Sequence, residues 1–486
     1  MIQTVRRIPL RSLPLLLLGL SMLARPAFGA DGERTSTLKD QQQVAVTIYN
    51  QDLALIKDSR VVALDRGENA LAWRDVSARI RPETALLRSP AHPGAFSLIE
   101  QNFDFDLLTP QKLLDKHVGR KLRVIKTHPT SGAETSEEAT LLSANDGAVL
   151  QFADRVESHP PGRLAFQTVP ESLRDRPTLV IRLDAAEAGR QALELSYLTG
   201  GLSWKADYVA ELSARDDRLD LNGWVTLTNQ SGTGFRNARL QLVAGDVNRV
   251  QDEVRRYRQQ PMALAQAAPA PAPMSEESLF EYHLYTLDRP TTIANNQTKQ
   301  VALLSASQVP VKKEFRLQGA DYYYRNSQSE LGKKLKVGVF VEFENKGGSL
   351  GIPLPKGTLR VYKRDGSGNA QFVGEDRIDH TPKNETVRVK LGDAFDVTAD
   401  KKQTDFQKVN GWTRYNYVYE AAFQIELKNA KNEAVSVKVV EPIPGDWEIL
   451  AESQPHRKDA SNIAVWNVAV PADGKATLTY RARVKY

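Results

Sequence analysis

The sequence predicts an all-β protein made of tandem β-sandwich (Ig-like) domains, with a small β-barrel-like module in its N-terminal part and one short helix. Three observations predict this fold class: long stretches in which apolar and polar residues alternate, turn-forming residues between them, and a single segment with helical start and stop signals. Alternation with a period of two places every second side chain on the same face of a sheet, so each strand buries one face.

The clearest strand is predicted at residues 202–212, where Leu202, Trp204 and every second residue after them are apolar. Residues 335–343 and 415–427 alternate in the same way. Because the intervening positions are mostly polar, we expect antiparallel sheets with one face in a core and the other in solvent.

Three asparagines mark the ends of predicted strands. Asn229, Asn345 and Asn429 each follow an alternating strand and precede a polar connection and a further alternating strand. Asparagine bonds its own backbone and tolerates left-handed geometry, so it suits the point where a strand leaves a sheet. The recurrence favours three similar strand–loop–strand units in a sandwich plan. A role as ligands is the alternative for these asparagines.

The helix is predicted in the segment TPQKLLDKHVG, with Thr109 as its cap, proline in its first turn and Gly119 beyond its end. Short strands around an Asn-Asp-Gly turn follow and resemble a compact barrel. The tract at residues 251–278 is rich in Ala and Pro and cannot form a packed core, so it is expected as a disordered insertion. The expected parts are a signal peptide (1–30), an N-terminal β domain (31–108), the barrel-like module (109–187) and a C-terminal β-sandwich region (188–486) that contains the insertion.

The first thirty residues have the order of a secretory signal peptide: three arginines, a Leu-rich core and then small residues. The apolar run at residues 13–23 is about half of the roughly 20 residues that a membrane-spanning helix needs. We therefore expect general secretory export, cleavage after Gly29 or Ala30, and a periplasmic location, with release to the medium as an alternative. No transmembrane helix is expected in the mature chain.

Charge and cysteine content exclude several classes of function. The chain has 65 basic and 59 acidic residues, and four of the arginines lie in the predicted signal peptide, so the mature chain is nearly neutral. Without a dense Lys/Arg cluster, no nucleic-acid partner is expected. The chain has no cysteine, which excludes disulfides, thiolate metal sites, cysteine-linked lipid anchors and cysteine nucleophiles.

No motif with the spacing of a catalytic or metal-binding site is present, and the seven histidines are scattered singly, so neither a metal nor a cofactor is expected. The best polar cluster is GEDRIDHTP, in which Glu375, Asp376, Asp379 and His380 fall within six positions. A carboxylate pair for acid–base catalysis is one hypothesis. A solvated strand edge, with the residues split across two faces, is the favoured interpretation.

Aromatic residues suggest a second kind of site, because an aromatic face attracts the apolar face of a sugar ring. The tyrosines at 415, 417 and 419 share the buried register of the strand that they open, which favours a core role for them. The candidates for an exposed binding surface are Trp224, on the face opposite Val225, together with Tyr322, Tyr324 and Trp412.

Several segments in order resemble a known family: LSYLTGGLSWKADYVAEL, residues 221–250, LPKGTLRVYKRDGSGNAQFVGEDRIDHTPKNE and LGDAFDV. They are similar to the C-terminal domain of a bacterial exported family of unknown function that includes the mucoidy inhibitor A proteins. The resemblance covers about residues 190–486. It implies a β domain in an envelope protein and supplies no catalytic residues. Two features depart from the family: Ala206 stands where proline is common, and no coiled-coil heptads precede the domain.

The sequence therefore predicts a non-enzymatic binding or assembly protein of the periplasm that engages an envelope protein or glycan. One alternative is a hydrolase of an envelope polysaccharide or peptidoglycan, with carboxylates between Glu375 and Asp379. A second alternative is an outer-membrane β-barrel protein, because the last strand alternates up to the aromatic Tyr486.

Overall fold

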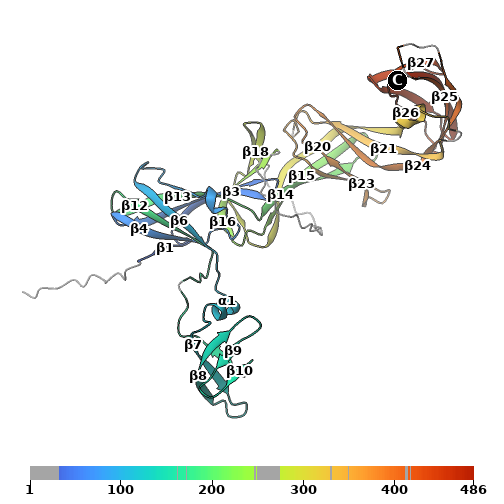
Figure 1. The fold of residues 1–486 in the computed structure, drawn as a ribbon. Helices are drawn as coiled ribbons and strands as arrows, with labels where there is room; N and C mark the ends of the chain where they lie inside the picture. Colours follow the sequence, from blue (N-terminus) through green and yellow to red (C-terminus); the bar gives the residue numbers. More distant parts are fainter. Residues whose placement is uncertain are drawn as a thin grey trace, which may run out of the picture.

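The computed structural model describes residues 32–160, 162–170, 172–245, 248, 274–328, 331–348, 350–410, 414–415 and 417–486. Strands dominate this part of the chain, and α1 (Pro110–Asp115) is its one α-helix. The prediction of an all-β protein of sandwich domains is confirmed. The sandwiches form an elongated row, and a small module hangs from one side of it (Figure 1). The predicted signal peptide lies outside the described residues.

Two sheets form the sandwich at the N-terminal end of the row. One has the order β1-β4-β12-β6, and the other contains the neighbours β2-β3-β13-β5. Inside, Arg60 is buried and donates to Asp58, while the indole nitrogen of Trp73 donates to the same carboxylate. This pairing satisfies a charge that would otherwise be costly to bury. The elements are β1 (Arg34–Ser36), β2 (Gln41–Tyr49), β3 (Leu53–Leu64), β4 (Gly67–Arg74), η1 (Pro82–Thr84), β5 (Leu86–Arg88), β6 (Phe96–Asp104), β12 (Thr178–Ala185) and β13 (Gly189–Thr199).

The small module carries the predicted helix. Thr109 caps it, since the Thr109 hydroxyl accepts a hydrogen bond from the backbone N–H of Lys112 at 3.2 Å, and Gly119 after its end has φ +80°. Five antiparallel strands form an open path in the order β10-β9-β8-β7-β11, where a barrel-like closure was expected. They are β7 (Lys121–Thr127), β8 (Glu134–Ser143), β9 (Val149–Gln151), β10 (Val156–Ser158) and β11 (Arg163–Ala165).

The rest of the row repeats one plan three times. In each repeat, a strand ends at or beside one of the three asparagines, and the next strand pairs in parallel with a strand from an earlier part of the chain. In the first unit β15 (Arg218–Asn229) leads to β16 (Phe235–Ala244), which pairs with β2. In the second, β21 (Gly332–Glu344) leads to β22 (Gly357–Arg364), which pairs with β14 (Leu202–Leu212). In the third, β25 (Val418–Asn429) leads to β26 (Val435–Pro442), which pairs with β20 (Gln297–Gln318).

Neighbouring units share strands. The strand β20 pairs with β15 up to Pro310 and with β21 from Val311 onward. The strand β24 (Thr386–Lys408) pairs with β21 up to Lys401 and with β25 from Val397. Because the backbone hydrogen bonds run on from one unit into the next, the units are not separate domains on exposed linkers.

Further strands complete the units. They are β17 (Ser275–Leu279), β18 (Tyr282–Thr286) and β19 (Thr291–Ile293) in the first, β23 (Ala370–Ile378) in the second, and β27 (Asp446–Glu452), β28 (Arg457–Ala460), β29 (Ile463–Val470) and β30 (Gly474–Lys485) in the third, with η2 (Asp321–Tyr324) beside it. The predicted insertion is only partly described. Residues 251–273 lie outside the described residues, whereas 275–278 belong to β17, because their backbone pairs with β18.

The three asparagines are buried and hold the strand ends in place. Each side-chain oxygen accepts a hydrogen bond from a backbone N–H of the loop that follows, and each side-chain amide donates to carbonyls of that loop and of a second segment. The closest backbone partners are Ser231 N (3.0 Å), Thr233 O (2.9 Å) and Ala294 O (3.1 Å) for Asn229; Gly351 N (3.1 Å), Ile352 O (2.8 Å) and Pro382 O (2.9 Å) for Asn345; and Lys431 N (3.1 Å), Glu433 O (2.8 Å) and Pro471 O (2.9 Å) for Asn429.

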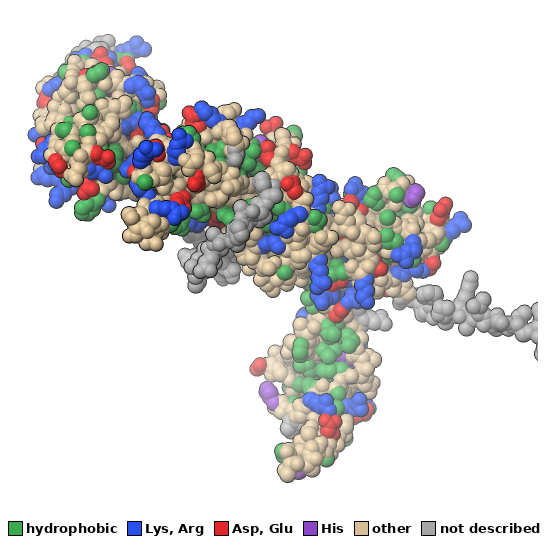
Figure 2. Space-filling view, turned by 180° about the vertical axis from the view of Figure 1, so that it is seen from behind, with side chains coloured by type: hydrophobic (Ala, Val, Ile, Leu, Met, Phe, Trp, Pro, Cys, Tyr) green, Lys and Arg blue, Asp and Glu red, His purple; other side chains and the backbone are tan. Residues whose placement is uncertain are grey.

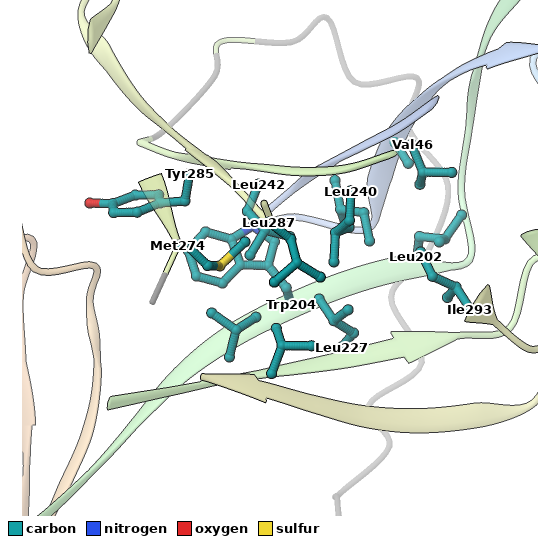
Figure 3. Close-up of a cluster of buried hydrophobic side chains, with 14 of the residues drawn as sticks. Val46, Leu202, Trp204, Leu227, Leu240, Leu242, Met274, Tyr285, Leu287 and Ile293 are labelled. Carbon is teal, nitrogen blue, oxygen red and sulfur yellow. The ribbon is translucent and has the colours of Figure 1, made fainter. Parts of the chain in front are cut away.

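The core of the first unit lies between its two sheets. Figure 3 shows the indole of Trp204, from β14, among Leu227, Leu242 and Met274. All four side chains are buried, and alternation turns Trp204, Leu227 and Leu242 inward from the two sheets. The hydroxyl of Tyr285 donates to the carbonyl of Pro353 at 2.8 Å and so joins the first unit to the second. The third unit has a separate core.

Candidate binding surface

The predicted carboxylate cluster does not converge on one site. Glu375 lies on one face of β23 and pairs with Arg360 at 3.0 Å, and Arg360 also pairs with Asp207 at 3.0 Å. Asp376 follows directly and therefore lies on the opposite face. It accepts hydrogen bonds at 2.8 Å from the backbone N–H groups of Arg377 and Lys390. A general acid and a general base must reach the same substrate, and this strand separates the two carboxylates.

Asp379 and His380 lie just beyond β23. Asp379 is exposed, and its backbone carbonyl accepts a hydrogen bond from the hydroxyl of Thr381 at 2.9 Å. The Nδ1 atom of His380 accepts a hydrogen bond from the backbone N–H of Lys356 at 3.3 Å. Across the described ranges, no three His, Asp or Glu side chains gather in a way that could hold a metal ion.

The predicted surface aromatics have different environments. Trp224 is half-buried on the outer face of β15, and Val225 faces the core. Tyr322 on η2 is 52% exposed. Tyr324 is fully buried, and its hydroxyl is bonded to Glu441 and Tyr480, so it offers no surface. Trp412 lies outside the described residues.

A buried ion pair, which the sequence did not reveal, lies beneath η2. The ammonium of Lys401 is 2.7 Å from both carboxylate oxygens of Glu441, and the two side chains are 1% and 0% exposed. The ammonium also lies 4.3 Å from the ring centre of Tyr323. Burial lowers the pKa of Lys401, and Glu441 opposes this shift. Burial also raises the pKa values of Tyr324 and Tyr480 well above the usual 10.0.

Four aromatic rings lie together at one end of the third unit, and we call them the ring cluster: Phe406, Tyr417, Tyr419 and Tyr486. The ring centres of Phe406 and Tyr419 are 5.3 Å apart, those of Tyr417 and Tyr419 are 6.2 Å apart, and those of Tyr419 and Tyr486 are 6.0 Å apart. The first two pairs are close to parallel, at 28° and 2°.

Tyr417 and Tyr419 lie on the same face of the chain as the core residues of β25, but nearer to its exposed end. Phe423 and Ala421 are buried, Tyr419 is half-buried and Tyr417 is 50% exposed. The face that lies in the core at Phe423 therefore reaches solvent at Tyr417. Aromatic carbon in the core register of β25 is therefore accessible to solvent at Tyr417.

Cations surround the exposed rings. The ammonium of Lys408 is 5.1 Å from the ring centre of Tyr417, and the guanidinium of Arg414 is 5.8 Å from that of Tyr415. Lys408 is exposed and has no ion-pair partner among the residues that the structure describes. The hydroxyl of Tyr415 donates to Asp446 at 2.7 Å, and this hydrogen bond raises the pKa of Tyr415.

The element η2 borders the ring cluster. Burial raises the pKa of Tyr486, and the nearby Arg325, which follows η2, acts against that shift. The arrangement provides aromatic faces, phenol hydroxyls and cations on one surface. Such a surface can stack on the apolar face of a sugar and bond its hydroxyl or carboxylate groups.

None of the four rings was predicted at a binding surface: Tyr417 and Tyr419 were expected in the core, yet Tyr417 is 50% exposed, and Phe406 and Tyr486 were missed. The alternation of the last strand places Tyr486 on the core-facing side, so the sequence pattern did indicate the position of this ring. No sequence pattern indicated the position of Phe406. The register of β24 shifts between Gln403 and Asp405, and this shift moves Phe406 onto the inner face.

A family model described as "Domain of unknown function (DUF4139)" matches residues 193–486. The chain belongs to this family. The DUF4139 domain begins within β13 and contains all three repeat units and the ring cluster. Strands that precede the DUF4139 domain complete its sheets, since β3 pairs with β13 and β2 pairs with β16. The expected membership in a family of unknown function is confirmed. A comparison with curated proteins gave no match.

Proposed function

We propose that this DUF4139 protein is an exported binding protein of the bacterial envelope that engages a glycan at the ring cluster. The observation that carries the proposal is the half-exposed ring of Tyr417 beside Lys408, a cation that has no ion-pair partner among the described residues. Leaving an aromatic ring of this size in water forfeits its burial energy. A sugar ring stacked on Tyr417 recovers that energy, and Lys408 then donates hydrogen bonds to the sugar's oxygens.

The export half of the proposal rests on the first thirty residues, whose order of charge, apolar core and small residues is that of a signal peptide. The location that follows is the periplasm. Kinship with the mucoidy inhibitor A proteins belongs to the proposal as well, and it rests on the ordered segments from about residue 190 onward. No helix in the described part of the chain has the length and apolarity needed to cross a membrane.

The environment of the carboxylates favours binding over hydrolysis. Glu375 is engaged by Arg360, and Asp376 by two backbone N–H groups. A catalytic acid and a catalytic base must reach the same scissile bond, whereas Glu375 and Asp376 lie on opposite faces of β23. The ring cluster, in contrast, presents groups that can hold a sugar without a chemical step.

The experiment is a retention screen with the chain from residue 31 onward against purified peptidoglycan, neutral polysaccharides and uronate-containing polysaccharides. We expect retention of at least one class without release of shorter products. Tyr417→Ala should weaken retention roughly tenfold, which corresponds to about 1.4 kcal/mol. The matched control is Phe372→Ala, since Phe372 is similarly exposed (55%) but lies in the second unit. Retention that is absent for every class, or unchanged in Tyr417→Ala, contradicts the proposal.

A further inference from the structure

The hairpin formed by β17 and β18 projects from the first unit (Figure 1) and ends in an apolar tip. Leu279 is 44% exposed and Phe280 is 84% exposed. The centres of the Phe280 and Tyr282 rings are 6.3 Å apart, so the tip presents more than one apolar side chain. A contiguous apolar projection of this kind on a folded protein commonly marks an interaction site.

The backbone at the tip is strained. Leu279 pairs with Tyr282, so the turn consists of Phe280 and Glu281 alone, and Phe280 has φ +57°. Two-residue hairpin turns place glycine, asparagine or aspartate at positions with positive φ, because a bulky side chain is disfavoured there. Phe280 therefore has an unfavourable conformation and also leaves its ring in water. Backbone strain at a side chain that stays exposed to solvent points to a function for that side chain.

Acidic residues flank the tip. Glu277 and Glu281 are exposed, and Glu276 is bonded to His283 at 2.8 Å. No lysine or arginine lies between residues 275 and 287. Figure 2 shows acidic side chains along this projection. The charge disfavours anionic lipids and nucleic acids, and it suits an apolar hollow with a cation at its rim.

The chain itself contains such a hollow where the first and second units meet, and we call it the joint hollow. It has a volume of about 660 Å³ and includes Val309, Phe343 and Leu350 in its lining. That volume lies within the range of roughly 300–1,000 Å³ of protein pockets that enclose small ligands. At its rim, Lys346 pairs with Glu344 and Glu342 pairs with Arg388, while the exposed Lys312 has no ion-pair partner among the described residues.

The hairpin and the joint hollow are neighbours on one chain. The strand β18 runs from the tip to Tyr285, whose hydroxyl bonds Pro353, three residues beyond Leu350 in the lining. Phe280 nevertheless remains 84% exposed, so it does not fill the hollow of its own chain. In a dimer with a two-fold axis, both copies use the same surface. The hairpin tip of each copy can then enter the joint hollow of its partner.

We propose that two copies of this chain associate reciprocally, with Leu279 and Phe280 of each copy in the joint hollow of the other and Glu281 beside Lys312. The association rests on surfaces of the first and second units. It is independent of the glycan proposal, which concerns the third unit.

The test is sedimentation velocity of the chain from residue 31 onward over a range of concentrations, at low and high salt. We expect a monomer–dimer equilibrium whose dimer fraction falls with salt, because an exposed ion pair is screened. Phe280→Gly should abolish the dimer and leave the fold intact, since glycine relieves the strain of the turn. Lys312→Glu should weaken the dimer about tenfold or more, and Glu281→Lys added to Lys312→Glu should restore it.

Three results overturn the proposal: a monomer at every concentration, a dimer that persists in Phe280→Gly, or a charge exchange that fails to restore the association lost in Lys312→Glu. Circular dichroism of each variant verifies folding. A monomer that instead binds neutral vesicles through Phe280 assigns the tip to a membrane and also overturns the proposal. Glycan retention measured on the same variants should be unchanged, so failure of one proposal is distinguishable from failure of the other.

Discussion

The ion pair between Lys401 and Glu441 gives a strong prediction about the third unit. Both side chains are essentially inaccessible to water, and the ammonium contacts both carboxylate oxygens at 2.7 Å. Removing one partner leaves the other charge buried without compensation. We expect Lys401→Met alone, or Glu441→Leu alone, to lower the free energy of unfolding of this unit by about 3–5 kcal/mol.

Replacing both residues should cost far less. Lys401→Met combined with Glu441→Leu leaves no buried charge, and the hydroxyls of Tyr324 and Tyr480, 2.8 Å apart, still bond each other. Replacement of a buried pair by apolar residues of similar volume is often neutral or stabilising. We therefore expect the double variant within about 2 kcal/mol of the unchanged protein, and a coupling of at least about 4 kcal/mol between the two sites.

Hydrogen exchange followed by mass spectrometry is the suitable assay, because several coupled units do not unfold in one step and exchange reports each segment separately. The single variants should accelerate exchange in β25, β26 and β30 and leave β14 and β15 unchanged. Two outcomes refute the reasoning: a Lys401→Met protein that exchanges like the unchanged one, or a double variant whose loss equals the sum of the two single losses.

Three further predictions concern the remaining features. Asn429→Ala removes the hydrogen bonds to two carbonyls and one backbone N–H. It should lower the free energy of unfolding of the third unit by about 2–4 kcal/mol, measured by hydrogen exchange in β25 and β26. An unchanged exchange rate contradicts this role. Gly319→Ala should lower the free energy of unfolding of the third unit by about 1–3 kcal/mol, measured by exchange in β26, because its new methyl carbon would overlap the carboxylate of Glu441; an unchanged exchange rate contradicts it. Burial raises the pKa values of Tyr208, Tyr324 and Tyr480 above the usual 10.0, so the folded state keeps protons that the unfolded state loses. Stability should therefore fall as the pH rises above about 10, with these tyrosines ionising only on unfolding, and tyrosinate absorbance that rises before the loss of circular dichroism contradicts it.

Much of the fold is readable in local patterns. The alternating stretch at residues 202–212 has the bounds of β14 and its buried face, although Asp207 on the other face is buried as well, and Thr109 is the cap of the one α-helix in the described residues. Both follow from interactions within one strand or one turn. Likewise, alternation alone implied that Glu375 and Asp376 would lie on opposite faces, as they do.

Long-range features left no such signal. The pairing of β16 with β2 joins residues about two hundred positions apart. The alternation within each strand does not indicate which other strand it pairs with. In the sequence, Lys401 looks like an ordinary solvent-exposed lysine of a strand. Its partner Glu441 lies in another strand, and only the fold brings the two side chains together. Phe280 was also unremarked, since a positive φ at a phenylalanine contradicts its local preference.

The most direct test of glycan binding at the ring cluster is a calorimetric titration of the retained glycan into the unchanged chain, Tyr417→Phe and Tyr417→Ala. Phenylalanine keeps the aromatic face and loses only the hydroxyl, so its dissociation constant should stay within about threefold of that of the unchanged chain. Alanine removes the face, and its dissociation constant should rise roughly tenfold or more. Equal dissociation constants for all three proteins would contradict a binding site at Tyr417.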